Sequence, residues 1–324
     1  MQIILESLKA RGIPEQAQQV ILASWRQSTR KQYVSYIRRW IHFCDRESTD
    51  PLQTHVNIIL KFLSELYHCG TGYSGINTAK CAIANYATLV GGQPIEGNQV
   101  LSKFMKGIFN LKPPQSRYAR IWNVSLVLNY IRSLPEHCEL SLKELTLKLC
   151  MLILLTSAQR VQTLYFLTIE HLNLYEDNAV FVVNKLLKQS RPGHSGVHVS
   201  LKGYPMDHRI CVLKALKDYI SRTSPLRGEE KRLFISHKKP HTAVSTDTIA
   251  RWTKEMLALS GVDTEIYSAH STRAAATSAA EVKNVPIKDI MARAGWSAEK
   301  TFRTYYKKPI EEQNDFDIAV LSSS

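Results

Sequence analysis

Eight side chains able to act on a phosphate group stand in four separate stretches of the C-terminal two thirds of the chain. In chain order they are Arg160, Lys185, Lys188, His270, Arg273, Trp296, Tyr305 and Tyr306. His270 and Arg273 are three residues apart in AHSTRAAA, so a helix that starts there places both on one face. Tyr305 and Tyr306 are neighbours, and neighbouring helical side chains point about 100° apart. Only one of the two tyrosines can therefore face a given site.

Each stretch taken alone has an ordinary structural explanation. Arg160 follows a very apolar helix, where a cation satisfies helix-end carbonyls. Lysines on a hairpin, such as Lys185 and Lys188, commonly protect a sheet edge, and a tryptophan is most often a core residue. An isolated His-x-x-Arg is a weak motif. The functional interpretation depends on the whole set.

Together, these residue types are the parts needed to split a phosphodiester. A tyrosine hydroxyl attacks the phosphorus, and two arginines hold the non-bridging oxygens as charge builds in the transition state. A lysine protonates the departing 5′-oxygen, and a histidine acts as general acid and base for the tyrosine hydroxyl. A free tyrosine has a pKa near ~10, so it needs that help at neutral pH. No metal-ligand cluster is visible in the sequence, and we expect neither a metal ion nor a cofactor.

The bulk composition is that of a globular protein. A chain of 324 residues suits two domains, and an apolar content of 44% allows a real core. No apolar run reaches the ~18 residues of a membrane span, and the N-terminus lacks a signal pattern. The six cysteines are scattered with no CxxC pair, which is typical of reduced thiols in an intracellular protein.

The charge is the first hint of a partner. The chain has 42 Lys and Arg against 28 Asp and Glu, a formal net charge of +14. Residues 1–115 hold 13 basic and 7 acidic residues, and the remainder holds 29 and 21, so both parts are basic. A basic surface on two domains is typical of a protein that surrounds a polyanion such as DNA, although a soluble protein can also simply have a high pI.

The first part is predicted to be helical. Apolar residues at helical spacing, with Gly91-Gly92 as a C-cap after the third segment, mark four helices. They cover Ser28–Phe43, Val56–Tyr67, Ile76–Leu89 and Val100–Asn110. The following stretch contains Pro113-Pro114 among basic and polar residues, which predicts an extended linker.

The second part is predicted to hold helices around one β-hairpin. The helices are expected at Ser125–Leu134, Ser141–Leu155, Asp207–Ser221, Thr246–Ser260, Thr272–Lys283 and Ile287–Ala294. Ser141 and Glu144 have capping-box spacing. Two β-branched runs, Asn178–Val183 and His194–Leu201, flank Pro192-Gly193 and predict the hairpin.

With these motifs in place, the sequence resembles the tyrosine recombinases of the phage-integrase type over nearly its whole length. The resemblance is carried by AHSTR, by GWSAEKTFRTYY and by the segment around Arg160. More narrowly, SAQRVQTL, LLKQSRPG, AHSTRAAATSAA and GW…TF…YYKKP resemble recombinases of DIRS-type retrotransposons. The family implies a mainly α fold with a small β-hairpin or sheet, arranged as a two-domain DNA clamp. It implies a core-binding domain at 1–112, a linker at 113–120, and a catalytic domain at 121–324 that includes a C-terminal tail.

The resemblance also assigns roles. Arg160 is the first catalytic arginine, His270 and Arg273 form the His-x-x-Arg pair, and Trp296 fills the position where the family has His or Trp. Lys188 is the favoured lysine because LLK-x-S-[RK]-P-G is the form in DIRS-type relatives, and Lys185 is the second candidate. The nucleophile there is followed by x-[KR]-P, which favours Tyr306, with Tyr305 as the second candidate.

One position departs from the family pattern. Many members carry an acidic residue three positions after the first arginine, where this chain has Thr163, with Gln162 beside it. The departure puts in question how Arg160 is held. DIRS-like relatives also read RVQTL, so the departure need not abolish activity.

The resemblance implies a site-specific recombinase that cuts and rejoins duplex DNA through a 3′-phosphotyrosine. The expected DNA-contacting residues are Arg30, Lys31, Arg38, Arg39, Lys80, Arg117, Arg120 and Arg251. The partners implied are double-stranded DNA and three further copies of the chain in a tetramer on paired sites, with a monomer free in solution and no membrane. An intracellular location is expected, and a nuclear one if the chain comes from a eukaryotic DIRS-type element.

Two other functions remain open. A DNA-binding protein could keep the fold without catalysis, although all six catalytic positions hold competent residues. A type IB topoisomerase shares the Arg, Lys, His and Tyr chemistry, but the helical N-terminal part favours a recombinase. The residues after Pro309, including Phe316, Ile318 and Leu321, could dock on a neighbouring subunit or cover the protein's own core.

Overall fold

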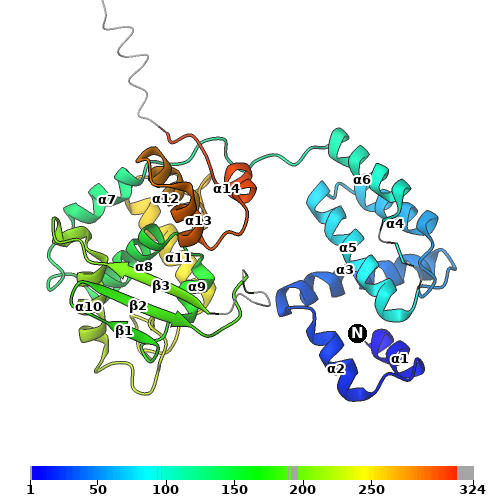
Figure 1. The fold of residues 1–324 in the computed structure, drawn as a ribbon, viewed down its shortest axis with the longest axis horizontal. Coiled ribbons are helices and arrows are strands. Elements are labelled where there is room, and N and C mark those ends of the chain that lie inside the picture. The colour runs from blue at the N-terminus through cyan, green and yellow to red at the C-terminus, as the bar shows by residue number, and fades with distance from the viewer. Residues whose placement is uncertain (1, 93, 96, 189, 191–195, 312–324) are drawn as a thin grey trace, which may run out of the picture. The chain divides into compact units, whose positions relative to one another are not determined.

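The computed structural model describes residues 2–92, 94–95, 97–188, 190 and 196–311 (Figure 1). The chain folds into two compact units, Met1–Ser116 and Arg117–Ser324. It is mainly α-helical with one small antiparallel sheet, as predicted. The predicted turn at Pro192-Gly193 and the apolar tail residues Phe316, Ile318 and Leu321 lie outside the described residues.

The first unit consists of helices in its described part. They are α1 (Gln2–Ala10), α2 (Glu15–Ala23), α3 (Gln27–Arg46), α4 (Val56–His68), α5 (Tyr73–Val90) and α6 (Gln99–Leu111). The last four match the predicted segments, whereas α1 and α2 were not located from the sequence. The helix α5 ends where Gly91 adopts the left-handed conformation (φ 76°), a position that favours glycine. The rings of Trp40, Phe43 and Phe62 pack together in the core of this unit.

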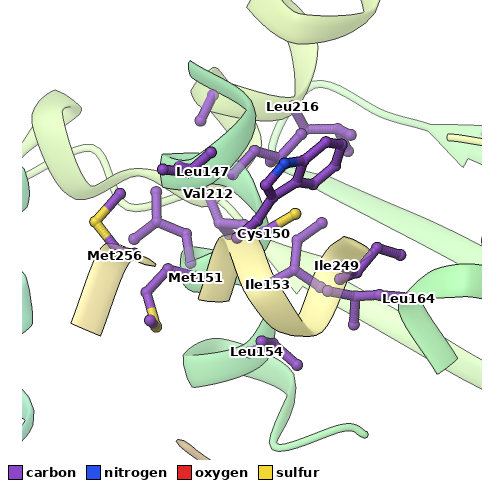
Figure 2. Close-up of a cluster of buried hydrophobic side chains, with 14 of the residues drawn as sticks. Leu147, Cys150, Met151, Ile153, Leu154, Leu164, Val212, Leu216, Ile249 and Met256 are labelled. Carbon is purple, nitrogen blue, oxygen red and sulfur yellow. The ribbon is translucent and has the colours of Figure 1, made fainter. Parts of the chain in front are cut away.

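The second unit is built around one buried helix. It contains α7 (Val124–Ser133), α8 (Leu142–Ser157), α9 (Val161–Phe166), α10 (Val212–Thr223), α11 (Thr246–Leu259), α12 (Ser271–Val282), α13 (Ile287–Ala294) and α14 (Glu299–Tyr305). The helix α8 begins at the predicted capping box of Ser141 and Glu144. Figure 2 shows its buried side chains, such as Cys150, among residues of α10 and α11. From Leu145 to Leu154 every side chain of α8 is buried, that of Lys148 included.

The sheet is larger than the predicted hairpin. It has three antiparallel strands, β1 (Leu172–Leu174), β2 (Asn178–Val183) and β3 (Val197–Lys202), in the order β1-β2-β3. The pair Phe181 and Val199 lies in register between β2 and β3. The strand β1 was not predicted, because three residues with only partial burial give no periodic signal. The predicted second strand began at His194, which lies outside the described residues.

One helix begins later in the structure than the sequence predicts. Asp207–Ser221 was expected to be continuous, but a 3₁₀ turn at His208–Ile210 precedes α10. The Asp207 carboxylate accepts a hydrogen bond from the backbone N–H of Arg209 at 3.0 Å, and Cys211 is extended. An aspartate that captures a nearby N–H competes with the helix in this way.

Candidate active site

The first arginine stands at a sharp turn that ends the buried helix. Ala158 follows α8 in the left-handed conformation (φ 51°), and Arg160 then serves as the N-cap of α9. The Arg160 carbonyl accepts a hydrogen bond from the backbone N–H of Thr163 at 2.8 Å. The half-buried Arg160 side chain is thus carried by a short, well-tied connection between two helices.

The second arginine is buried in the protein. Arg273, near the start of α12, is only 1% exposed. Its Nη1 donates to the Ala158 carbonyl at 2.9 Å, and its Nη2 donates to the Ala294 carbonyl. These two carbonyls lie at the C-terminal ends of α8 and α13. The alanines that follow, such as Ala274 and Ala275, let α12 pack closely against α8.

An aromatic pair covers the Arg273 guanidinium. Its Cζ lies 4.5 Å from the Trp296 ring centroid and 5.2 Å from that of Tyr306. The Trp296 and Tyr306 centroids are 4.5 Å apart. Trp296 reaches this position because Gly295 ends α13 in the left-handed conformation (φ 68°), which turns the chain back.

The two tyrosines differ sharply in their surroundings. Tyr306 is partly buried, and its hydroxyl lies 3.4 Å from His270 Nε2. Its backbone is fixed by the Ser278 hydroxyl, which donates to the Tyr306 carbonyl at 3.1 Å. Tyr305 is the last residue of α14 and is 68% exposed. Of the two, Tyr306 is the one that the structure brings to Arg273, His270 and Trp296.

Both candidate lysines lie in the connection between β2 and β3 and are exposed. Lys188 is close enough to His270 for its positive charge to lower the pKa of that imidazole. Leu187 beside it is buried in the core of the second unit, which ties this segment to the protein. The Leu187 N–H donates to the Ser190 hydroxyl at 2.9 Å within the same connection. The position of Lys188 is therefore compatible with the role expected of it.

The local electrostatics concentrate positive charge. Burial of the imidazole and the nearby cations Arg160, Arg273 and Lys188 lower the pKa of His270 from its ordinary value, although His270 as a whole residue is exposed. Burial and Arg160 also lower the pKa of Arg273, while Tyr306 acts in the opposite direction. Like charges held this close destabilise one another, so a bound anion would be strongly favoured here.

Two buried donors in this cluster have no acceptor among the described residues. They are Nε of Arg273 and Nε1 of Trp296. Leaving a buried donor unpaired costs roughly 1–3 kcal/mol, so such groups normally meet a partner. Together with the excess positive charge, they favour a ligand that brings negatively charged oxygens, such as a phosphodiester.

Three residues that position this site were not found by sequence reasoning. Gln159 donates from Nε2 to the Arg293 carbonyl at 2.7 Å, and Arg293 Nε donates to the Thr156 carbonyl at 3.0 Å. Ser278 holds the backbone of Tyr306, as described above. Their side chains act by reaching backbone atoms far away in the sequence, which leaves no periodic or motif signal.

The expected DNA contacts are mostly exposed side chains. Arg30, Lys31, Arg38 and Arg39 are exposed on α3, Lys80 is half-buried on α5, Arg117 and Arg120 are exposed before α7, and Arg251 is exposed on α11. The Arg39 guanidinium lies 5.8 Å from the Tyr36 ring centroid. Exposed cations of this kind are free of the core and suit phosphate contacts.

The described residues show neither a cluster of metal-binding side chains nor a membrane-spanning helix. These residues contain no group of three or more His, Cys, Asp or Glu side chains placed to hold a metal ion. No helix in that part of the chain is long and apolar enough to cross a membrane. All six cysteines are free thiols.

Solved structures with a similar fold include a site-specific recombinase and integrases in complexes with DNA. The Tn1549 transposon integrase in complex with transposon right end DNA has a TM-score of 0.60 at 14% identity, covering 99% of this chain and 98% of that one. A lambda integrase dimer bound to a COC′ core site has a TM-score of 0.57 at 15% identity, covering 88% and 91%. The XerH recombinase in a post-cleavage complex with difH DNA has a TM-score of 0.57 at 15% identity, covering 84% and 71%.

Sequence comparison gives the family. No curated protein sequence matches the chain significantly. The sequence model described as the phage integrase family matches residues 126–312, which is more than half of the chain and includes every candidate catalytic residue. This protein therefore belongs to the phage integrase family of tyrosine recombinases.

Proposed function

We propose that this protein is a site-specific DNA recombinase that cuts and rejoins duplex DNA through a 3′-phosphotyrosine on Tyr306, with no metal ion in the reaction. One observation carries the proposal. A tyrosine hydroxyl lies 3.4 Å from a histidine nitrogen, beside a buried arginine whose Nε has no protein acceptor among the described residues. The cluster has a nucleophile, a proton acceptor and a site for the anion on which they act.

In the cleavage step, the Tyr306 oxygen attacks the scissile phosphorus and its proton passes to His270. Arg160 and Arg273 bind the non-bridging oxygens, and the Trp296 N–H donates to the same phosphate. The bond between phosphorus and the 5′-oxygen breaks, and Lys188 supplies the proton that the 5′-oxygen takes up. The DNA strand is then joined to the protein through its 3′-phosphate.

Rejoining reverses these steps. A 5′-hydroxyl, from the same strand or from a partner strand, attacks the phosphotyrosine and returns its proton to Lys188. Tyr306 leaves with the proton held by His270. The energy of the broken bond is kept in the phosphotyrosine, so the reaction needs no nucleotide cofactor. Three cations of the chain surround the phosphate and take the part that a metal ion plays in other enzymes.

The proposed arrangement on DNA uses both units. Residues 1–112 form a core-binding domain and 121–324 the catalytic domain, with 113–120 between them along the phosphate backbone. Four copies of the chain assemble on paired sites, a proposal supported by the similar fold of a lambda integrase tetramer bound to a Holliday junction. The motifs SAQRVQTL and YYKKP extend the proposal to the DIRS-type branch.

A covalent-capture experiment tests the chemistry without knowledge of the target. The protein is incubated in EDTA with a pool of nicked duplexes of randomised sequence, since a nick lets the cleaved fragment diffuse away and traps the adduct. Sequencing of the captured DNA gives the target, and mass spectrometry gives the linked residue. We expect a DNA-linked peptide containing Tyr306. No adduct from any member of the pool, or an adduct that requires Mg²⁺, would refute the proposed mechanism.

The captured target then separates recombination from its alternatives. A recombinase transfers a labelled strand between two duplexes, whereas a type IB topoisomerase only relaxes supercoils. DNA affinity should also fall steeply as salt rises, because Lys and Arg contacts to phosphates release counterions. Tight binding without any adduct or strand transfer would instead indicate a DNA-binding protein without catalysis.

A further inference from the structure

The turn that carries Arg160 is bracketed by two buried polar side chains. Gln159 comes directly before the arginine and is 4% exposed, and Thr163 comes three residues after it and is 2% exposed. The Thr163 hydroxyl donates to Gln159 Oε1 at 3.2 Å. The Thr163 backbone N–H donates to the Arg160 carbonyl at 2.8 Å. Arg160 is therefore enclosed between two residues that are bonded to each other.

The same glutamine ties this turn to a distant part of the site. Gln159 Nε2 donates to the Arg293 carbonyl at 2.7 Å, and in return Arg293 Nε donates to the Thr156 carbonyl at 3.0 Å. The next residue, Ala294, offers its carbonyl to Arg273. The backbone that holds Arg160 and the backbone that leads to Trp296 are thus joined by reciprocal hydrogen bonds.

These reciprocal hydrogen bonds matter because the cations of the site repel one another and their backbones must be held in place. Arg160 lies close enough to His270 and Arg273 to act on both through its charge. Where an acidic residue follows the first arginine by three positions, its charge can offset that repulsion. Thr163 has no charge and cannot offset the repulsion in this way, but its hydroxyl supplies the hydrogen bond to Gln159.

We propose that Gln159 and Thr163 form a positioning pair that holds the Arg160 turn against α13 in place of the missing acidic side chain. The Gln159 amide uses both ends for this purpose, its oxygen for Thr163 and one N–H for the Arg293 carbonyl. This inference rests on the proposed function, since it concerns how the phosphate-binding arginines are kept in register.

Single-turnover cleavage of the captured target by side-chain variants tests the pair. Thr163→Val keeps the size and removes the donor, and we expect cleavage to slow by roughly tenfold, because a small displacement of a phosphate-binding group is costly. Thr163→Ser restores the hydroxyl and should recover most of the rate. DNA affinity should stay close to that of the wild type in both, since the outer contacts are unchanged.

Thr253→Val is the matched control. Thr253 on α11 is fully buried, and its hydroxyl also donates to a carbonyl, that of Ile249 at 2.8 Å. This variant loses a comparable hydrogen bond outside the pair, so we expect a similar change in melting temperature and no change in cleavage rate. If cleavage slows equally in Thr253→Val and Thr163→Val, the cause is a general loss of stability, and the proposed positioning role of Gln159 and Thr163 is refuted.

The double variant Gln159→Leu/Thr163→Val gives a second, independent readout. Because both side chains act through the same hydrogen bond, the double variant should cleave no more slowly than Gln159→Leu alone. If the double variant instead loses the product of the two single-variant rate losses, the two side chains act independently and the shared role is contradicted. Wild-type protein run alongside separates the two proposals: no adduct with the wild type overturns both, whereas a wild-type rate in Thr163→Val overturns the pair alone.

Discussion

Arg273 and Lys188 approach the same histidine from opposite kinds of surroundings. Arg273 is 1% exposed and bonded to two helix-end carbonyls, and it belongs with Trp296 and Tyr306 to what we call the helical side of the site, formed by α12, α13 and α14. Lys188 is exposed in the connection between β2 and β3, which we call the loop side. The helical side is fixed by packing before any substrate arrives. The loop side contributes an exposed cation, and we expect its removal to leave the fold intact.

This contrast matches the demands of the proposed chemistry. Groups that stabilise transition-state charge act best when they are preorganised, because they need not reorient during the reaction. A proton donor must instead reach the leaving oxygen and exchange its proton with solvent. We therefore expect variants on the two sides to affect stability and rate in different proportions.

The largest effect is expected at the nucleophile on the helical side. Tyr306→Phe removes only the hydroxyl and keeps the ring that packs 4.5 Å from Trp296, so the fold should survive while the covalent adduct disappears. Tyr305→Phe is the matched control, because that side chain is 68% exposed. Denaturing gels of the DNA-linked product measure both. Loss of the adduct only in Tyr305→Phe would move the nucleophile to the neighbouring residue.

Arg273→Ala should rank next and should affect both rate and stability. Removing one preorganised donor costs ~10²–10³-fold in rate. The carbonyls of Ala158 and Ala294 also lose their donor, which should lower the free energy of unfolding by about 1 kcal/mol or more. Single-turnover cleavage and urea unfolding are the measurements.

Arg222→Ala is the control for the stability part of that prediction. Arg222 also donates to two carbonyls, those of His137 at 3.2 Å and Leu140 at 2.6 Å. It should lose stability to a similar degree and keep its cleavage rate once folded. If Arg222→Ala slows cleavage as much as Arg273→Ala, the role of Arg273 in catalysis is refuted.

On the loop side, Lys188→Ala should slow cleavage by about 10²-fold, the range of a general acid. Its free energy of unfolding should stay within about 0.5 kcal/mol of the wild type, as for an exposed residue. A substrate with a 5′-bridging sulfur should restore the rate, because a thiolate leaves without a proton. Lys185→Ala is the matched control on the same connection. A rescue by sulfur in Lys185→Ala but not in Lys188→Ala would exchange the two assignments.

The same contrast explains what the sequence could predict. Helices with strong apolar periodicity, such as α3 and α13, were located to within a few residues, and the family motifs indicated the residues that meet at Tyr306. The short strand β1 and the 3₁₀ turn at His208–Ile210 were missed, because local hydrogen bonds and long-range pairing decide them. Tyr305 and Tyr306 could not be separated by spacing alone, since the way in which the end of α14 packs decides that Tyr306 is partly buried and Tyr305 exposed.

Gln159 and Arg293 show a second limit of sequence reasoning. Each donates to a carbonyl more than a hundred residues away, at separations of 134 and 137 positions. Propensity and periodicity describe neighbours in the chain, so they carry no information on such pairs. The departure at Thr163 was visible in the sequence, but its hydrogen bond to Gln159 required the three-dimensional structure.

The smallest expected effect is a shift in the pKa of His270, which both sides of the site influence. Arg273 on the helical side and Lys188 on the loop side both lower the pKa of His270, and Arg160, between α8 and α9, lowers it more than either. Removing a cation makes the protonated imidazole less costly, so the pKa should rise toward its ordinary value of 6.5. We expect Arg160→Met to raise it most, Lys188→Met to raise it less, and Lys185→Met to leave it unchanged. Titration of the imidazole Cε1 proton by NMR measures all three.

The lowered pKa also sets the sign of a stability change. In the unfolded chain His270 binds a proton near its ordinary pKa, while the folded protein resists it, so the unfolded state holds more protons between the two values. The His270 contribution to the free energy of unfolding is therefore kept above the ordinary pKa and decreases as the pH falls through it. Lys188→Met should weaken that dependence by bringing the two pKa values together. A larger shift of the His270 pKa in Lys185→Met than in Lys188→Met would place the wrong lysine beside the histidine, and the loop side would have to be reassigned.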